Sequence, residues 1–236
     1  MKMSLLSEIE LGRLKAGIIA AYGIPFIDDI EDFIWEAIFA YVRNIPLVDP
    51  LLQKREKKLF DLVDRGRGIG WSAKALQTNA KQGGSFEVVI QRSDVFKKAA
   101  DLGFQPLSMD SEPALLGTAL MKHWLDYKIK QDMISQGVSD ARVCILLKSQ
   151  DRKTYTFVEQ PLEQIPASEM DWRWTSDRKS GLQGWYRSHL KYRWYHGQTQ
   201  FFEVFNVPES APIITLEPKR IPLDKVIDIL HSELRK

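Results

Sequence analysis

The 236-residue sequence lacks several features that define particular classes of protein. Its single cysteine, Cys144, lies in the apolar run "ARVCILLK", which excludes a disulfide framework within the chain and favours a buried structural thiol. The first 23 residues carry charges between their apolar residues and never reach the roughly 18 uninterrupted apolar residues of a membrane span. We therefore expect a cytoplasmic protein with no membrane partner.

A strong charge of one sign is also missing. The formal net charge is only +2, so any contact with nucleic acid has to come from local clustering of basic residues. The four histidines have no metal-ligand spacing, and the sequence contains neither a P-loop nor internal repeats. With 44% apolar and 27% charged residues, the composition fits one globular domain spanning residues 1–236.

Apolar periodicity, caps and glycines predict both helices and strands. Residues 86–103 are expected to be helical because Ser85 follows the Gly83-Gly84 break as a cap and Gly103 can end the helix. Further helices are expected at 7–23, 28–44, 113–136 and 223–236, and strands at 57–64, 69–76, 141–149, 154–162 and 199–207. This order predicts an α/β (α+β) fold with a central mixed sheet flanked by helices.

The first two strands form a predicted hairpin around the turn at residues 65–68. Antiparallel register places Asp61 opposite Ser72, so that Lys74 shares a face with Asp61 and Asp64 falls on the other face. A slip of one residue would exchange Asp61 and Asp64. A surface ion pair alone would explain a carboxylate beside Lys74.

Together, Asp61, the run Ser72-Ala73-Lys74 and Glu87 resemble the PD-(D/E)XK nuclease superfamily. More narrowly, they are similar to type II restriction endonucleases in which the active-site glutamate has moved onto the following helix. The resemblance covers about residues 25–160. It implies catalytic roles for Asp61, Lys74 and Glu87, with Asp61 and Glu87 as the metal ligands. Ser72 would occupy the vacated acidic position, and Glu36 resembles the acid on the preceding helix that often approaches the metal.

The implied chemistry is hydrolysis of a phosphodiester with Mg²⁺, an ion that prefers oxygen ligands and keeps several waters. Lys74 would orient the attacking water and stabilise charge on the phosphorus. Three other interpretations of these residues remain. Glu87 would complement a helix dipole, Glu36 would be a solvated surface residue, and Ser72 with Lys74 would be an acyl-transfer pair, although no oxyanion loop is evident.

Residues 171–200 differ in composition from the rest of the chain. They hold four of the seven tryptophans, with six basic residues against two acids. We expect a DNA-recognition segment at about 165–208, in which Arg173 and Arg178 read bases. The other expected DNA contacts are Lys179, Arg187, Lys191 and Arg193. An alternative interpretation, favoured for the tryptophans, places Trp172, Trp174 and Trp194 in the core of a small β-subdomain.

These observations predict a Mg²⁺-dependent, site-specific endonuclease of type II that acts on double-stranded DNA. Cutting both strands of a symmetric site favours a homodimer, for which the N-terminal helices, with runs such as "LKAGIIAAYG", are candidate interface elements. The alternatives are a non-catalytic nucleic-acid-binding protein and a protein-interaction scaffold.

Overall fold

The computed structural model describes residues 6–47, 58–176, 178–217 and 219–235. The chain forms two compact units, each with its own sheet. Unit 1 comprises residues 1–79, 138–161 and 210–236, and unit 2 comprises 80–137 and 162–209. The catalytic core expected at 25–160 therefore divides between the units, whereas the recognition segment expected at 165–208 falls entirely within unit 2.

Unit 1 has a five-stranded mixed sheet in the order β1-β2-β4-β5-β10. Its strands are β1 (Leu62–Asp64), β2 (Ile69–Gln77), β4 (Asp140–Lys148), β5 (Thr154–Pro161) and β10 (Ile213–Thr215). β2 and β4 are parallel and the other pairs are antiparallel. A parallel pair needs a crossover connection, and the chain between these two strands includes residues 80–137 of unit 2.

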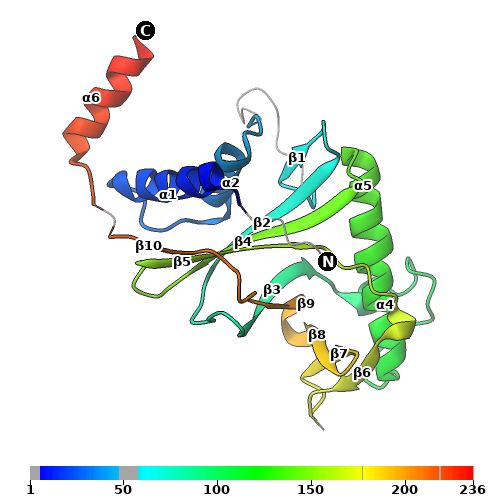
Figure 1. The fold of residues 1–236 in the computed structure, drawn as a ribbon. Coiled ribbons are helices and arrows are strands. Elements are labelled where there is room, and N and C mark those ends of the chain that lie inside the picture. The colour runs from blue at the N-terminus through cyan, green and yellow to red at the C-terminus, as the bar shows by residue number, and fades with distance from the viewer. Residues whose placement is uncertain (1–5, 48–57, 177, 218, 236) are drawn as a thin grey trace. The chain divides into compact units, whose positions relative to one another are not determined.

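Three helices belong to unit 1. α1 (Glu8–Gly23) starts with a capping box between Ser7 and Glu10, and α2 (Asp32–Arg43) ends at Asn44 in the left-handed conformation. α6 (Leu223–Leu234) follows β10. Figure 1 shows α1 and α2 side by side. They share a core with the sheet, built around the buried residues Trp35, Phe39, Trp71, Cys144 and Phe157.

Unit 2 has a five-stranded antiparallel sheet in the order β3-β9-β8-β7-β6. Its strands are β3 (Ser85–Arg92), β6 (Asp171–Trp174), β7 (Gly181–Tyr186), β8 (His189–Tyr195) and β9 (Gln200–Asn206). A short helix, α3 (Val95–Lys98), follows β3. The helix predicted at 113–136 is present as α4 (Pro113–Trp124), a π-helical turn η1 (Leu125–Lys130) and α5 (Gln131–Gln136), and it ends at Gly137 as expected. Two 3₁₀ turns, η2 (Ala167–Glu169) and η3 (His196–Gln198), complete the unit.

The helix predicted at 86–103 is wrong. Residues 85–92 form strand β3, and only the four residues of α3 in this range are α-helical. Phe86 and Val88 alternate as buried residues, and the run Val88-Val89-Ile90 is rich in β-branched side chains, which favour a strand. Pairing of β3 with β9, more than a hundred residues later, overrides the local helix signals.

The hairpin is present, but its first strand, predicted at 57–64, is limited to Leu62–Asp64 among the described residues. The strand pair β4–β5, strand β9 and the closing helix are confirmed. The mixed α/β class is also confirmed. Trp172 and Trp194 are buried in unit 2, as the β-subdomain interpretation expected, whereas Trp174 is half-buried. Within the described residues, no helix is both long and apolar enough to cross a membrane.

Candidate active site

The hairpin brings Asp61 and Lys74 together in unit 1. The register pairs Leu62 with Trp71, as predicted, and places Asp61 just before β1, where its N–H donates to the carbonyl of Trp71 at 2.9 Å. The Nζ atom of Lys74 lies 3.8 Å from Oδ2 of Asp61 and donates to the carbonyl of Ala73 at 2.9 Å. Both side chains keep part of their surface exposed, 26% for Lys74 and 19% for Asp61. The predicted proximity of these two residues is confirmed.

Asp64, the alternative partner, has a different role. Its carboxylate accepts hydrogen bonds from the N–H and the Nε of Arg67, at 3.0 and 2.6 Å. The side-chain hydrogen bond from Arg67 is the largest influence on the Asp64 carboxyl, and it lowers the pKa. Asp64 therefore stabilises the turn, and Asp61 is the carboxylate beside Lys74.

Two carboxylates accept hydrogen bonds from the edge of β2, next to the point where β1 begins. The N–H of Ala73 donates to Oδ2 of Asp61, and the N–H of Ala75 donates to Oδ1 of Asp32, each at 2.8 Å. Alternate amides on one strand edge are about 6.6 Å apart, so these two carboxylates bind at neighbouring sites on β2. The role of Asp32 was missed because an acid in a first helical turn reads as a capping residue.

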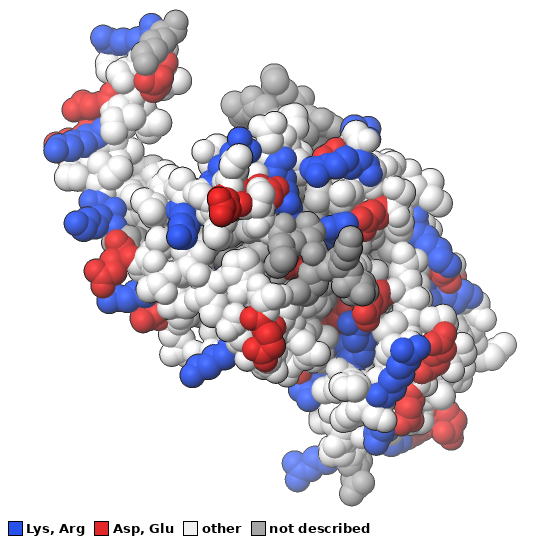
Figure 2. Space-filling view, in the orientation of Figure 1, with Lys and Arg blue, Asp and Glu red and all other residues white. Residues whose placement is uncertain are grey.

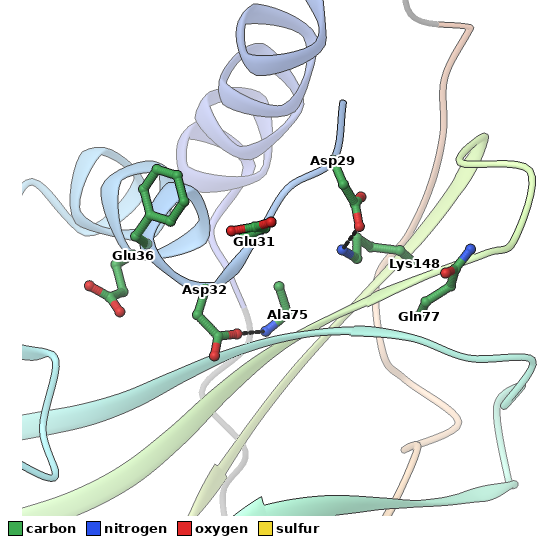
Figure 3. Close-up of a pocket in the computed structure, with 8 residues that line it drawn as sticks. Asp29, Glu31, Asp32, Glu36, Ala75, Gln77 and Lys148 are labelled. Atoms are coloured by element: carbon green, nitrogen blue, oxygen red, sulfur yellow. Dashed lines mark hydrogen bonds and ion pairs between the residues drawn. The ribbon is translucent and has the colours of Figure 1, made fainter. Parts of the chain in front are cut away.

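Glu36 lies one turn after Asp32 on α2 and is 92% buried, with 8% of its surface exposed. It lines a pocket of about 550 Å³ within unit 1. Figure 3 shows Asp32 and Glu36 extending from α2 toward β2. The lining residues are Asp29, Glu31, Asp32, Phe33, Glu36, Ala75, Gln77 and Lys148. The expectation of a solvated Glu36 is therefore wrong.

Lys148 neutralises one of the acids in this pocket. Its buried ammonium donates to Oδ2 of Asp29 and to the carbonyl of Ile30, both at 2.7 Å (Figure 3 shows the ion pair). Burial, the largest single influence, raises the pKa of Asp29, but the hydrogen bond and charge of Lys148, together with hydrogen bonds from Tyr22 and the N–H of Ile30, lower the pKa overall. Lys148 was missed because it ends an apolar strand that gives no sign of an acidic partner.

Ser72 and Lys74 are two residues apart and point to the same face of β2. Ser72 is 5% exposed. The residues between and beside them, Trp71, Ala73 and Ala75, face the core shared with α1 and α2. Ser72 therefore stands beside Lys74 on the strand, as its predicted place in the motif requires.

Glu87 does not stand at a helix start. It lies on β3 in unit 2, where its carboxylate forms an ion pair of 2.5 Å with Nη1 of Arg193 on β8. The helix on which the relocated-glutamate arrangement depended is thus absent at this position, and so is the helix dipole that Glu87 was expected to complement. Among the described residues, no three His, Cys, Asp or Glu side chains cluster closely enough to hold a metal ion.

The basic residues of 171–200 are mostly paired with acids of unit 2. Lys191 lies 3.0 Å from both Glu163 and Glu203, and its side chain is only 16% exposed. The other pairs are Arg173 with Asp171, Lys179 with Asp110, and Arg193 with Glu87. Acidic and basic side chains intermix on the face in Figure 2.

The composition of residues 171–200 therefore overestimated how many of their basic side chains lack an acidic partner. Acids from residues 87, 110, 163 and 203 lie outside 171–200 in the sequence but reach its cations in the fold. Lys191 in particular is held between two carboxylates and is not available to a phosphate. Arg178 and Arg187 are the predicted DNA contacts for which no acidic partner occurs in the part of the chain that the structure describes.

Comparison of the chain with models of protein families, with curated proteins and with solved structures gave no match in any of the three. Inference about function therefore starts from the residues of the chain itself.

Proposed function

We propose that the chain is a metal-dependent endonuclease that cleaves double-stranded DNA at specific sites. The observation that carries the proposal is the pairing of Asp61 with Lys74 across the β1–β2 hairpin, 3.8 Å apart and partly exposed. A carboxylate and an ammonium at this separation provide a metal ligand and a fixed positive charge side by side. Phosphodiester hydrolysis can use both groups.

Asp61, the carboxylate beside Lys74, suits Mg²⁺, which uses one or two protein carboxylates and keeps several waters. Glu36 on α2 is the proposed second ligand, and the ion would supply charge stabilisation at the scissile phosphate. Glu87 is left out of this assignment because it is paired with Arg193. The hydrogen bond from Ala73 fixes the Asp61 carboxylate in place.

Lys74 has two roles in this proposal. Its ammonium is held by the carbonyl of Ala73, so it is oriented before substrate arrives. From there it orients the attacking water and stabilises the negative charge that accumulates on the phosphoryl oxygens. Ser72 contributes a hydroxyl contact on the same strand face.

The test is incubation of the purified chain with phage DNA and Mg²⁺. Discrete bands, abolished by EDTA, are expected. Lys74→Ala should lower cleavage at least 100-fold and leave DNA binding detectable. Lys153→Ala is the matched control, because Lys153 is a half-exposed surface lysine in unit 1 that pairs with Glu217. Undiminished cutting by Lys74→Ala would remove its assigned role, and binding of DNA without cleavage by the unaltered chain would favour a non-catalytic DNA-binding protein.

A further inference from the structure

Helix α6, red in Figure 1, carries exposed apolar side chains. Five of its twelve residues are large apolar side chains that are more than half exposed. They are Leu223, Ile227, Ile229, Leu230 and Leu234. A helix of about 18 Å with so much apolar surface in water gains stability mainly by covering it.

Four of these residues form one stripe. Leu223, Ile227, Leu230 and Leu234 recur at intervals of four, three and four residues, which is the a/d spacing of a coiled coil. The stripe therefore fits another helix of the same kind better than it fits a flat surface.

The polar side of α6 argues against a membrane surface as the partner. Interfacial helices carry an excess of Lys and Arg that meets anionic lipids. Within α6, Lys225 is outnumbered by Asp224, Asp228 and Glu233. The same excess of acid disfavours a nucleic acid.

We infer that α6 pairs with the α6 of a second copy of this chain, in antiparallel orientation. The stripe is self-complementary when it is turned end for end. Leu223 then faces Leu234 of the second copy, and Ile227 faces Leu230. Asp224 and His231 flank the same side of the stripe, so the reversal also brings Asp224 toward His231 of the second copy.

This interface is distinct from the one expected at the N-terminal helices. There, Leu14 and Ile18 of α1 are fully buried within the core of unit 1, whereas Ile19 is 48% exposed. Because α6 is short, the paired surface falls below the roughly 1,200 Å² of a standard interface. The association should therefore be reversible and dependent on concentration. It is independent of the proposed nuclease activity.

The first experiment is sedimentation of the full chain over a range of concentrations. We expect the mass to move from monomer toward dimer as concentration rises. The double variant Ile227→Glu/Leu230→Glu should stay monomeric with unchanged circular dichroism. Lys225→Glu/Ser232→Glu, which places two acids away from the stripe, should dimerise like the unaltered chain. A monomer at every concentration, or an undiminished dimer in the stripe variant, would overturn the inference.

Cross-linking tests the orientation. A disulfide needs Cα atoms within about 7 Å, and the native Cys144 is fully buried, so engineered thiols report on α6 alone. Mixing Ile227→Cys with Leu230→Cys should give a cross-linked dimer of the two variants under mild oxidation. Leu230→Cys alone should cross-link poorly, and efficient self-cross-linking would show a parallel pair instead.

Discussion

The Nε1 atom of Trp71 lies 2.9 Å from Oε1 of Glu159 inside unit 1. Glu159, whose side chain is 2% exposed, also accepts hydrogen bonds from Arg142, at 3.0 Å, and from Arg43. The carbonyl of Trp71 in turn accepts from the N–H of Asp61. A buried carboxylate thus holds the strand that positions the candidate metal ligand.

Replacing Glu159 by alanine should destabilise unit 1 severely. The change removes one of the two carboxylate partners of Arg43, a 94% buried side chain that keeps its ion pair with Glu10, so the loss should reach at most about 3–5 kcal/mol, the cost of breaking a buried ion pair. Urea unfolding followed by circular dichroism measures the loss. Glu217→Ala is the control, since Glu217 is 83% exposed and its pairing with Lys153 should contribute less than about 1 kcal/mol. Equal losses from both variants would contradict this account of Glu159.

The stability of unit 2 should depend on pH through Glu203. This residue is completely buried, and its charged neighbour is Lys191, whose Nζ lies 3.0 Å from Oε1. Burial raises the pKa of Glu203 to about 7, although the nearby charge of Lys191 works in the opposite direction. The folded protein therefore holds this proton more tightly than the unfolded chain, whose ordinary pKa is 4.5. The contribution of Glu203 to the free energy of unfolding is therefore complete below pH 4.5 and is lost as the pH rises through about 7.

The measurement is the free energy of unfolding at pH 5 and at pH 8. For the unaltered chain, Glu203 should contribute a fall on the order of 3 kcal/mol between the two. Glu203→Gln should remove that contribution. Glu169→Gln, an exposed change in the same unit, should leave the pH dependence as it was. The assignment fails if Glu203→Gln retains the full slope.

Gly117→Ala should strain the packing of α4 on β6. A Cβ atom at position 117 would lie 2.1 Å from the indole of Trp172, which is itself buried, so helix or ring has to move. Overpacking of this kind costs about 1–3 kcal/mol or more. Gly12→Ala in α1 is the control, because its Cβ meets nothing within 4 Å and the better helix propensity should stabilise by about 0.5–1 kcal/mol. Thermal unfolding should move in opposite directions for the two variants.

DNA binding should depend on Arg178 and Arg187 rather than on Lys191. Each of these arginines can neutralise a phosphate, so Arg178→Ala/Arg187→Ala should weaken binding and reduce the salt slope by about two. Fluorescence anisotropy with labelled duplex at several salt concentrations measures this. Lys15→Ala, an exposed change on α1, is the control. An unchanged slope in the double variant would exclude these residues from the DNA contact.

Local patterns predicted local structure well. The hairpin register follows from a four-residue turn, and the end of α5 follows from Gly137, so both lie within the reach of a short window. β3 was missed because its partner, β9, lies far along the chain. Long separation in the sequence also explains why the basic residues of 171–200 were expected to be free of acidic partners. Glu163 and Glu87 are neighbours of Lys191 and Arg193 only after the sheet has formed.

The order of the chain also constrains how unit 1 folds. Its parallel strands β2 and β4 are separated by the sixty-two residues between Gln77 and Asp140, and β10 is synthesised only after the whole of unit 2. During translation, at about 5–20 residues per second, the β1–β2 hairpin emerges seconds before the strands that complete its sheet. Pairings of such long sequence separation form slowly. The apolar face of β2 therefore stays exposed to water until β4 has been synthesised. We expect the nascent chain to be most prone to aggregation during this interval.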